Sequence, residues 1–371
     1  MPLIINGRAH RATGPSRSRL GIGWRRGPEP GRDAGPGFGT EPRPRGSGRL
    51  LWNSAALLLA LASLAAAQTA PPANKDEGEI PIITSDVRLV VLHASVADSK
   101  GKLIANLPEN SFKVYENGAE QQIKLFRRED VPVSIGIVVD NSASMREKRK
   151  QVETAALDLV RSSNPQDEVF IVNFNDESYL DVPFTSDMKK LEDGLARIDS
   201  RGGTALRDAI GGSIDYVKEH GKKDKKALLV ITDGNDTASD DRNTLEKLTE
   251  KARQSEVLIY AIGLLNEEER HEAKKAKRVL NALTTASGGV SYYPRELAEV
   301  DKIALEVASD IRNQYVIAYS PSVQALDGSF REIKVTVNGP GHPSVRTRTG
   351  YYATPDSPKK NASLRPSSPL P

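Results

Sequence analysis

Residues 134–144 read SIGIVVDNSAS, and this stretch decides the fold. The apolar run SIGIVV has the length and the β-branched content of a strand that is buried on both faces. The strand ends at Asp140, and two hydroxyl side chains, Ser142 and Ser144, follow on a tight turn before a helical pattern begins. A buried strand that leads through a polar turn into a helix is typical of a parallel sheet covered by helices.

The same alternation of short apolar strands and helical patterns extends over residues 131–313. The further strands that we predict read EVFIVNF, ALLVIT, VLIYAI and VSYY. Helices are predicted at residues 146–162, 187–198, 205–220, 244–254, 267–285 and 297–311. This order of elements predicts a doubly wound α/β domain, with a mostly parallel sheet and helices on both of its faces.

Residues 85–130 and 314–353 have a different character, because apolar and polar residues alternate along them. The first segment contains KVYENGAEQQI, in which Asn117-Gly118 is a typical hairpin turn. The second contains YVIAYSP and FREIKVTV, which alternate in the same way. We therefore predict that the two segments pair into one small β module that flanks the α/β domain.

The two ends of the chain have compositions that do not suit a folded domain. Residues 1–48 lack lysine and repeat Arg, Gly and Pro, which indicates either a disordered extension or an over-extended reading of the gene start. Residues 49–67 form an apolar run after several arginines and end in small residues, as in a cleaved signal peptide, with a retained membrane anchor as the alternative. Residues 68–84 are interpreted as a linker and residues 354–371 as a disordered tail. We expect export to the periplasm or out of the cell.

Composition excludes several kinds of site. The chain of 371 residues contains no cysteine, so disulfides, thiol nucleophiles and cysteine-containing zinc sites are excluded. Its five histidines are scattered, which favours oxygen ligands for any metal. The net charge is +3, yet the first fifty residues hold ten arginines against three acidic residues, so the rest of the chain is weakly acidic. No basic face suited to nucleic acid is expected there.

Three loops carry oxygen-bearing side chains at places where a parallel sheet collects ligands. They read Asp140-Asn141-Ser142-Ala143-Ser144, Arg201-Gly202-Gly203-Thr204 and Thr232-Asp233-Gly234-Asn235-Asp236. Each loop taken alone is also compatible with a helix cap or an Asx turn. Because ligands bind at the carboxyl ends of strands in open α/β sheets, the three loops together favour a metal site over three separate caps.

The set Asp140, Ser142, Ser144, Thr204 and Asp233 resembles the metal-ion-dependent adhesion site (MIDAS) of von Willebrand factor type A domains and integrin I domains. The flanking β segments resemble bacterial von Willebrand factor type A-related proteins of the acidobacterial type. The resemblance implies that Ser142 and Ser144 bind the ion directly, Thr204 directly or through water, and the two aspartates largely through water. The implied ion is Mg²⁺ or Mn²⁺, with Ca²⁺ as the weaker candidate. A Glu or Asp side chain from a protein partner would complete its coordination.

These features predict an exported, metal-dependent protein-binding or cell-adhesion module that is not an enzyme. A scaffold that organises other proteins of the cell envelope is an alternative that uses the same site. A metal-dependent hydrolase or phosphatase is the third possibility, since Asp140 and Asp233 follow strand ends where catalytic acids often lie. Against it, the second acid that phosphotransfer would want is replaced by Ser142, and no histidine is near the loops in sequence. Contact with a membrane is expected only through an uncleaved N-terminal segment, and the oligomeric state stays open.

Overall fold

The computed structural model describes residues 25–26, 88–128, 130–196, 200–266 and 270–355. The predicted signal peptide at 49–67 and the linker at 68–84 lie outside the described residues, and so do most of the N-terminal extension and the tail. Within the described ranges, no helix combines the length and the apolar character needed to cross a bilayer.

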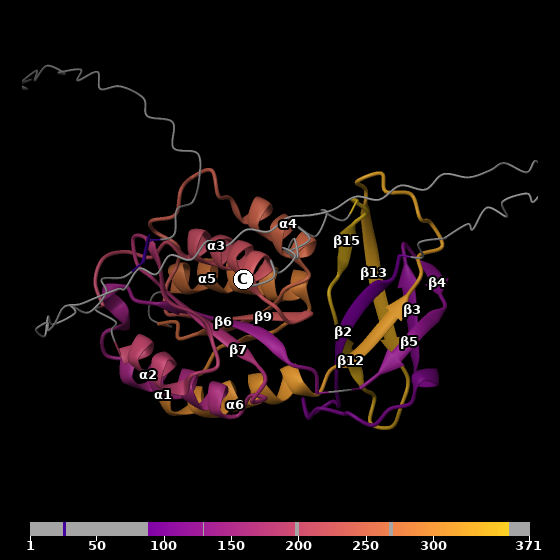
Figure 1. Cartoon of the computed structure of the whole chain (residues 1–371), viewed down its shortest axis with the longest axis horizontal. Helices are drawn as coiled ribbons and strands as arrows, with labels where there is room; N and C mark the ends of the chain where they lie inside the picture. Colours follow the sequence, from indigo (N-terminus) through magenta and orange to yellow (C-terminus); the bar gives the residue numbers. More distant parts are fainter. Residues whose placement is uncertain (1–24, 27–87, 129, 197–199, 267–269, 356–371) are drawn as a thin grey trace, which may run out of the picture. The chain divides into compact units, whose positions relative to one another are not determined.

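A seven-stranded sheet forms the centre of the α/β domain (Figure 1). Its strands are β1 (Arg25–Arg26), β6 (Val133–Asp140), β7 (Glu168–Phe174), β8 (Ser178–Thr185), β9 (Lys225–Thr232), β10 (Leu258–Gly263) and β11 (Ser291–Tyr292). They are ordered β1-β8-β7-β6-β9-β10-β11, and every neighbouring pair is parallel except β7 and β8. The short strand β1 was not anticipated from the sequence.

Helices cover both faces of this sheet, which confirms the predicted fold class (Figure 1). They are α1 (Arg149–Arg161), α2 (Met188–Ala196), α3 (Leu206–His220), α4 (Leu245–Ser255), α5 (Arg270–Ser287) and α6 (Val300–Arg312). Helices α1, α2 and α6 pack on one face, and α3, α4 and α5 pack on the other. Short 3₁₀ turns precede α1 at η2 (Ala143–Met145) and α6 at η3 (Leu297–Glu299).

Strand β6 is buried along its whole length because it lies between these two helical layers. Ile135 and Ile137 pack toward α1 and α6, whereas Val138 packs toward α3. Gly136 lies on the α3 side, where a Cβ atom would come within 2.3 Å of the ring of Phe170. The glycine therefore makes room for a core aromatic residue, and this explains its place in an otherwise branched apolar strand.

The chain order places a topological switch point beside β6. From β6 the chain runs first to β7 and β8 on one side, and then crosses to β9, β10 and β11 on the other. Val139 is in register with Ile231, so the last residues of β6 and β9 lie side by side. Such a switch point is where open α/β sheets bind ligands.

The β module consists of two four-stranded sheets, β14-β2-β12-β5 and β15-β13-β3-β4. Their strands are β2 (Val90–Ala97), β3 (Phe112–Glu116), β4 (Ala119–Gln121), β5 (Ile123–Arg127), β12 (Tyr315–Tyr319), β13 (Phe330–Val337), β14 (Ser344–Arg346) and β15 (Gly350–Tyr352), and the turn η1 (Glu109–Ser111) precedes β3. Each sheet combines strands from before and after the α/β domain. Asn117 and Gly118, both with positive φ, join β3 and β4 into a hairpin.

The main departure from the predicted elements is β8. This strand reads SYLDVPFT and pairs antiparallel with β7, but it was not predicted. It is only half-buried and contains Asp181 and Pro183, so it lacks the continuous apolar run of the parallel strands. The helix boundaries differ from the predicted ones by a few residues, as is usual for fraying helix ends.

Candidate metal centre

Asp140 stands at the end of β6 and is held in place by two hydrogen bonds. Its Oδ1 accepts from the backbone N–H of Ser142 at 2.9 Å, and its Oδ2 accepts from the hydroxyl of Thr232 at 2.5 Å. Thr232 is the last residue of β9, which is the neighbouring strand. The carboxylate is 1% exposed, so its position is set by the sheet and by the turn that follows β6.

A chain of polar contacts runs from this turn to the loop after β9. The hydroxyl oxygens of Ser142 and Ser144 lie 3.1 Å apart. Ser144 donates to Oδ1 of Asp233 at 2.8 Å. The other oxygen of Asp233, Oδ2, accepts from the ammonium of Lys148 at 2.5 Å. Ser142 is buried and Ser144 is exposed, so the chain of contacts leads from the sheet edge to the surface.

The loop with two glycines lies directly against the turn after β6. The N–H of Arg201 donates to the carbonyl of Asn141 at 3.0 Å, and the N–H of Ala143 donates to the carbonyl of Gly202 at 3.3 Å. Gly202 has a φ of +75°, and a Cβ atom on it would lie 2.1 Å from a carboxylate oxygen of Asp176. A side chain at this position would therefore be strained and would clash, which explains the glycine.

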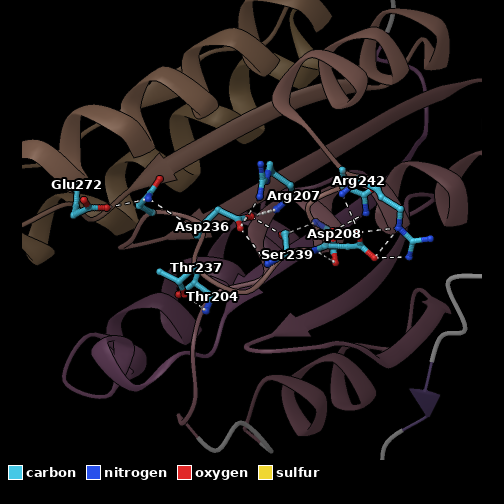
Figure 2. Close-up of polar contacts among 11 residues, drawn as sticks. Thr204, Arg207, Asp208, Asp236, Thr237, Ser239, Arg242 and Glu272 are labelled. Atoms are coloured by element: carbon cyan, nitrogen blue, oxygen red, sulfur yellow. Dashed lines mark hydrogen bonds and ion pairs between the residues drawn. The ribbon is translucent and has the colours of Figure 1, made fainter. Parts of the chain in front are cut away.

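Thr204 follows the two glycines and is fixed to the segment after β9. Its N–H donates to the hydroxyl of Thr237 at 3.0 Å, and its carbonyl accepts from the N–H of Thr237 at 2.8 Å (Figure 2). Its hydroxyl oxygen lies 3.8 Å from the position of a Cβ built on Gly234, the residue that follows Asp233. These hydrogen bonds hold Thr204 against the loop that carries Asp233, although the two loops are separate in sequence.

Figure 2 shows how the segment after β9 is anchored to the start of α3. Asp236 accepts from the backbone N–H of Arg207 at 2.7 Å and from the hydroxyl of Ser239 at 2.5 Å. Ser239 in turn accepts from the backbone N–H of Asp208 at 3.1 Å. These contacts satisfy backbone donors at the N-terminal end of α3, which have no partner within the helix. These hydrogen bonds fix the loop after β9, which carries Asp233 and contacts Thr204.

The electrostatics of Asp140 are set by its burial. Removal from water raises the pKa of its carboxyl from 3.8 to about 6, although the hydrogen bonds from Thr232 and Ser142 oppose this change. The nearby carboxylate of Asp233 adds to the increase in pKa. Two carboxylates beside each other at a buried strand end form an environment in which a bound cation would be favourable.

The donor atoms fit a small, hard cation. The described residues include no group of three or more His, Cys, Asp or Glu side chains that could hold a metal ion. The oxygens gathered here come instead from two carboxylates and from hydroxyls, with Ser144 open to solvent. Mg²⁺ prefers oxygen ligands and keeps several of its waters, so a donor set with few carboxylates suits it.

The structure brings four of the five predicted residues, Asp140, Ser142, Ser144 and Asp233, into one connected set of polar contacts. The fifth predicted residue, Thr204, adjoins the set through the loop contacts described above. Sequence reasoning missed Lys148 and Asp176, which contact this centre or support it. It placed Thr232 in one of the three loops but did not foresee its hydrogen bond to Asp140.

Comparison with known proteins agrees with this geometry. Residues 135–235 match the family model of the von Willebrand factor type A domain. By this match, residues 135–235 form a von Willebrand factor type A domain. The matched residues begin in β6 and end just after Asp233, so they include all five candidate metal ligands. No curated protein matches the chain.

Several solved structures are similar to part of this chain. A von Willebrand factor type A protein from Catenulispora acidiphila is 12% identical with a TM-score of 0.41, over 66% of this chain and 75% of that chain. BatB from Bacteroides thetaiotaomicron is 18% identical with a TM-score of 0.40, over 48% and 98%. Proximal thread matrix protein 1 of the mussel byssus, in a form with a zinc-occupied MIDAS motif, is 16% identical with a TM-score of 0.43, over 53% and 50%. At these values the likenesses carry no conclusion about ligand or partner.

Proposed function

We propose that this chain is an exported, metal-dependent protein-binding module that acts in adhesion. In this proposal Ser142 and Ser144 bind Mg²⁺ or Mn²⁺ directly, and Asp140, Asp233 and Thr204 complete the site. The partner is a protein that offers a Glu or Asp side chain. The proposal concerns binding and involves no chemical turnover.

The observation that carries the proposal is the contact chain Ser142–Ser144–Asp233, whose outer hydroxyl is exposed. A set of helix caps would satisfy only the helix ends and would not need to join two loops. Here Ser144 Oγ contacts Asp233 Oδ1 across 89 positions of sequence, at the edge where β6 and β9 end. Hydroxyls and a carboxylate that converge at a solvent-facing strand end support a cation site that a partner can reach.

The chemistry of the donor set favours an acidic partner. When bound, the metal supplies an electrophilic centre that can accept one further oxygen ligand. The direct protein ligands are mainly neutral hydroxyls, so they neutralise little of its charge. Asp140 is buried and stays behind Ser142, where it orients the turn through the N–H of that residue. A carboxylate of a partner therefore gains more from this site than a neutral side chain does.

The contacts of Asp140 argue against a hydrolase or phosphatase that uses this residue as a nucleophile. Both oxygens of its carboxylate already accept hydrogen bonds, and the residue is 1% exposed. A nucleophile must reach its substrate, and Asp140 lies beneath the turn instead. The proposal therefore assigns it a positioning role.

Metal-dependent stabilisation of the full-length chain tests the proposal. We expect millimolar Mg²⁺ or Mn²⁺ to raise the thermal unfolding midpoint, because a ligand that binds only the folded state stabilises it. The increase should vanish in the double variant Ser142→Ala, Ser144→Ala. Thr154→Ala is the matched control, since it removes an exposed hydroxyl on α1 that contacts only its own helix. If the double variant responds to metal as the native chain does, the ion binds elsewhere and the proposal is wrong.

Co-purification with and without a chelator separates adhesion from a scaffold role in the envelope. Loss of attachment to a surface or matrix when the metal is removed supports adhesion. Release of a complex of envelope proteins on chelation would support the scaffold instead.

A further inference from the structure

Lys148 forms an ion pair with Asp233, one of the candidate metal ligands. It is the N-cap residue of α1 and follows Ser144 by four positions, and the turns between Ser144 and α1 bring its side chain to Asp233. Its ammonium lies 2.5 Å from Asp233 Oδ2. The side chain of Asp233 is 1% exposed and that of Lys148 is 24% exposed. This ion pair is therefore shielded at the carboxylate and open to water on the lysine side.

The pair leaves neither oxygen of Asp233 without a donor. Oδ1 accepts from the Ser144 hydroxyl, and Oδ2 accepts from the Lys148 ammonium. An ion that binds Ser144 and Asp233 must therefore replace donors that the protein itself supplies. The hydroxyl can rotate its hydrogen away and coordinate through oxygen, because it is both donor and acceptor. The ammonium has no acceptor function and can only move away.

The charges at the site also indicate that the Lys148 ammonium must move away when a divalent ion binds. The two carboxylates of the site, Asp140 and Asp233, balance one divalent ion when both are ionised. If Lys148 stayed in place, three positive charges would face two negative ones beside carboxylates that are shielded from water. Like charges repel strongly in such surroundings. Lysine has a flexible four-carbon stem, so its ammonium can swing into the solvent that already reaches it.

We propose that Lys148 is a tethered competitor of the divalent ion, which holds Asp233 in the metal-free protein and is displaced when the ion binds. This inference rests on the proposed metal site and describes how metal binding at that site is regulated. It explains how two adjacent carboxylates are tolerated without metal. It also means that the ion binds more weakly than its ligands alone would allow, so that the site responds to metal concentration.

Calorimetric titration of Mn²⁺ into the full-length chain tests the inference. The test variant is Lys148→Met, which removes the charge and keeps most of the stem. The matched control is Lys150→Met, which removes the same charge from an exposed position two residues further along α1. We expect the Kd for Mn²⁺ to fall about tenfold in Lys148→Met, which corresponds to ~1.4 kcal/mol. The Lys150→Met variant should bind as the native chain does, and Lys148→Arg, which keeps the charge, should not gain affinity.

The outcomes separate this inference from the proposed function. If the native chain binds Mn²⁺ and Lys148→Met binds with equal or lower affinity, Lys148 supports the site and the competitor role is overturned. An equal gain in Lys148→Met and Lys150→Met would also overturn it, because it would reflect overall charge. If neither the native chain nor any variant binds Mn²⁺, the proposed metal site itself is wrong.

Discussion

Substitution of Asp140 by asparagine should have opposite effects on stability and on metal binding. Asp140→Asn keeps the shape of the side chain and removes its charge. We expect the metal-free variant to be more stable than the native chain at neutral pH. In millimolar Mg²⁺ the native chain should gain stability and the variant should not, because the variant lacks the carboxylate that the ion requires.

The magnitude follows from the burial of Asp140. Its pKa is raised from 3.8 to about 6, so the folded state binds the proton more tightly than the unfolded chain does. Stability contributed by the protonated form is therefore lost as pH rises from 3.8 to about 6, and the loss is complete above that window. Two pKa units correspond to about 3 kcal/mol. Asparagine turns an amide toward Thr232 and forces that hydroxyl to rotate, at a cost of about 1 kcal/mol. The net gain is about 2 kcal/mol.

Urea denaturation of the full-length chain in chelator measures this gain directly. The advantage of Asp140→Asn over the native chain should be present at neutral pH and should shrink as the pH falls. Below 3.8 it should reverse to a deficit of about 1 kcal/mol, because only the cost of rotating the Thr232 hydroxyl then remains. Asp193→Asn, at an exposed position on α2, controls for the loss of one negative charge. An Asp140→Asn variant that is less stable than the native chain in chelator at neutral pH would refute the reasoning, because the buried charge would then not be a net burden.

Two further predictions concern the loop support and the pH range. Asp176→Ala removes the acceptor of the Gly203 N–H, a hydrogen bond of 2.9 Å, and should weaken Mn²⁺ binding about fivefold by loosening the loop that carries Thr204. Unchanged affinity in a calorimetric titration would contradict this. Burial lowers the pKa of His93 from 6.5 to about 3. The stability that the neutral ring provides is therefore lost as the pH falls below 6.5, and the loss should reach about 2 kcal/mol at about pH 5. The variant His93→Gln should lose less stability over this pH range than the native chain, whereas His271→Gln, at an exposed position, should behave as the native chain does. If urea denaturation gives the same change of stability with pH for His93→Gln and the native chain, His93 is not responsible.

The parallel part of the fold was predictable from the sequence because its strands are buried on both faces. β6, β7, β9 and β10 are near-continuous apolar runs, and such runs stand out against the amphipathic helices between them. β8 could not be found in this way, because this strand of the sheet is only partly covered and lacks a continuous apolar run. Its antiparallel direction also follows from a short turn after β7, and the apolar pattern carries no information about strand direction.

The five candidate ligands were proposed from their places in the sequence: Asp140, Ser142, Ser144 and Asp233 lie at or after the ends of predicted strands, and Thr204 opens a predicted helix. The residues that support them were not predicted. Lys148 follows Ser144 by four positions at the start of α1, and in sequence it looks like an ordinary solvated lysine of a helix. Asp176 belongs to the turn before β8, so its approach to Gly203 depends on a strand that the sequence did not predict. Thr232 is the last residue of a buried strand, and only the register between β6 and β9 brings its hydroxyl to Asp140.

The position of a bound ion tests the central claim most directly. Crystals of the full-length chain grown with Mn²⁺ would allow the ion to be located from its anomalous scattering. The account predicts an ion in contact with the hydroxyl oxygens of Ser142 and Ser144 at the end of β6, with the ammonium of Lys148 moved away from Asp233. An ion found at another place, or none at this site while Asp233 keeps its contact with Lys148 in saturating Mn²⁺, would contradict it.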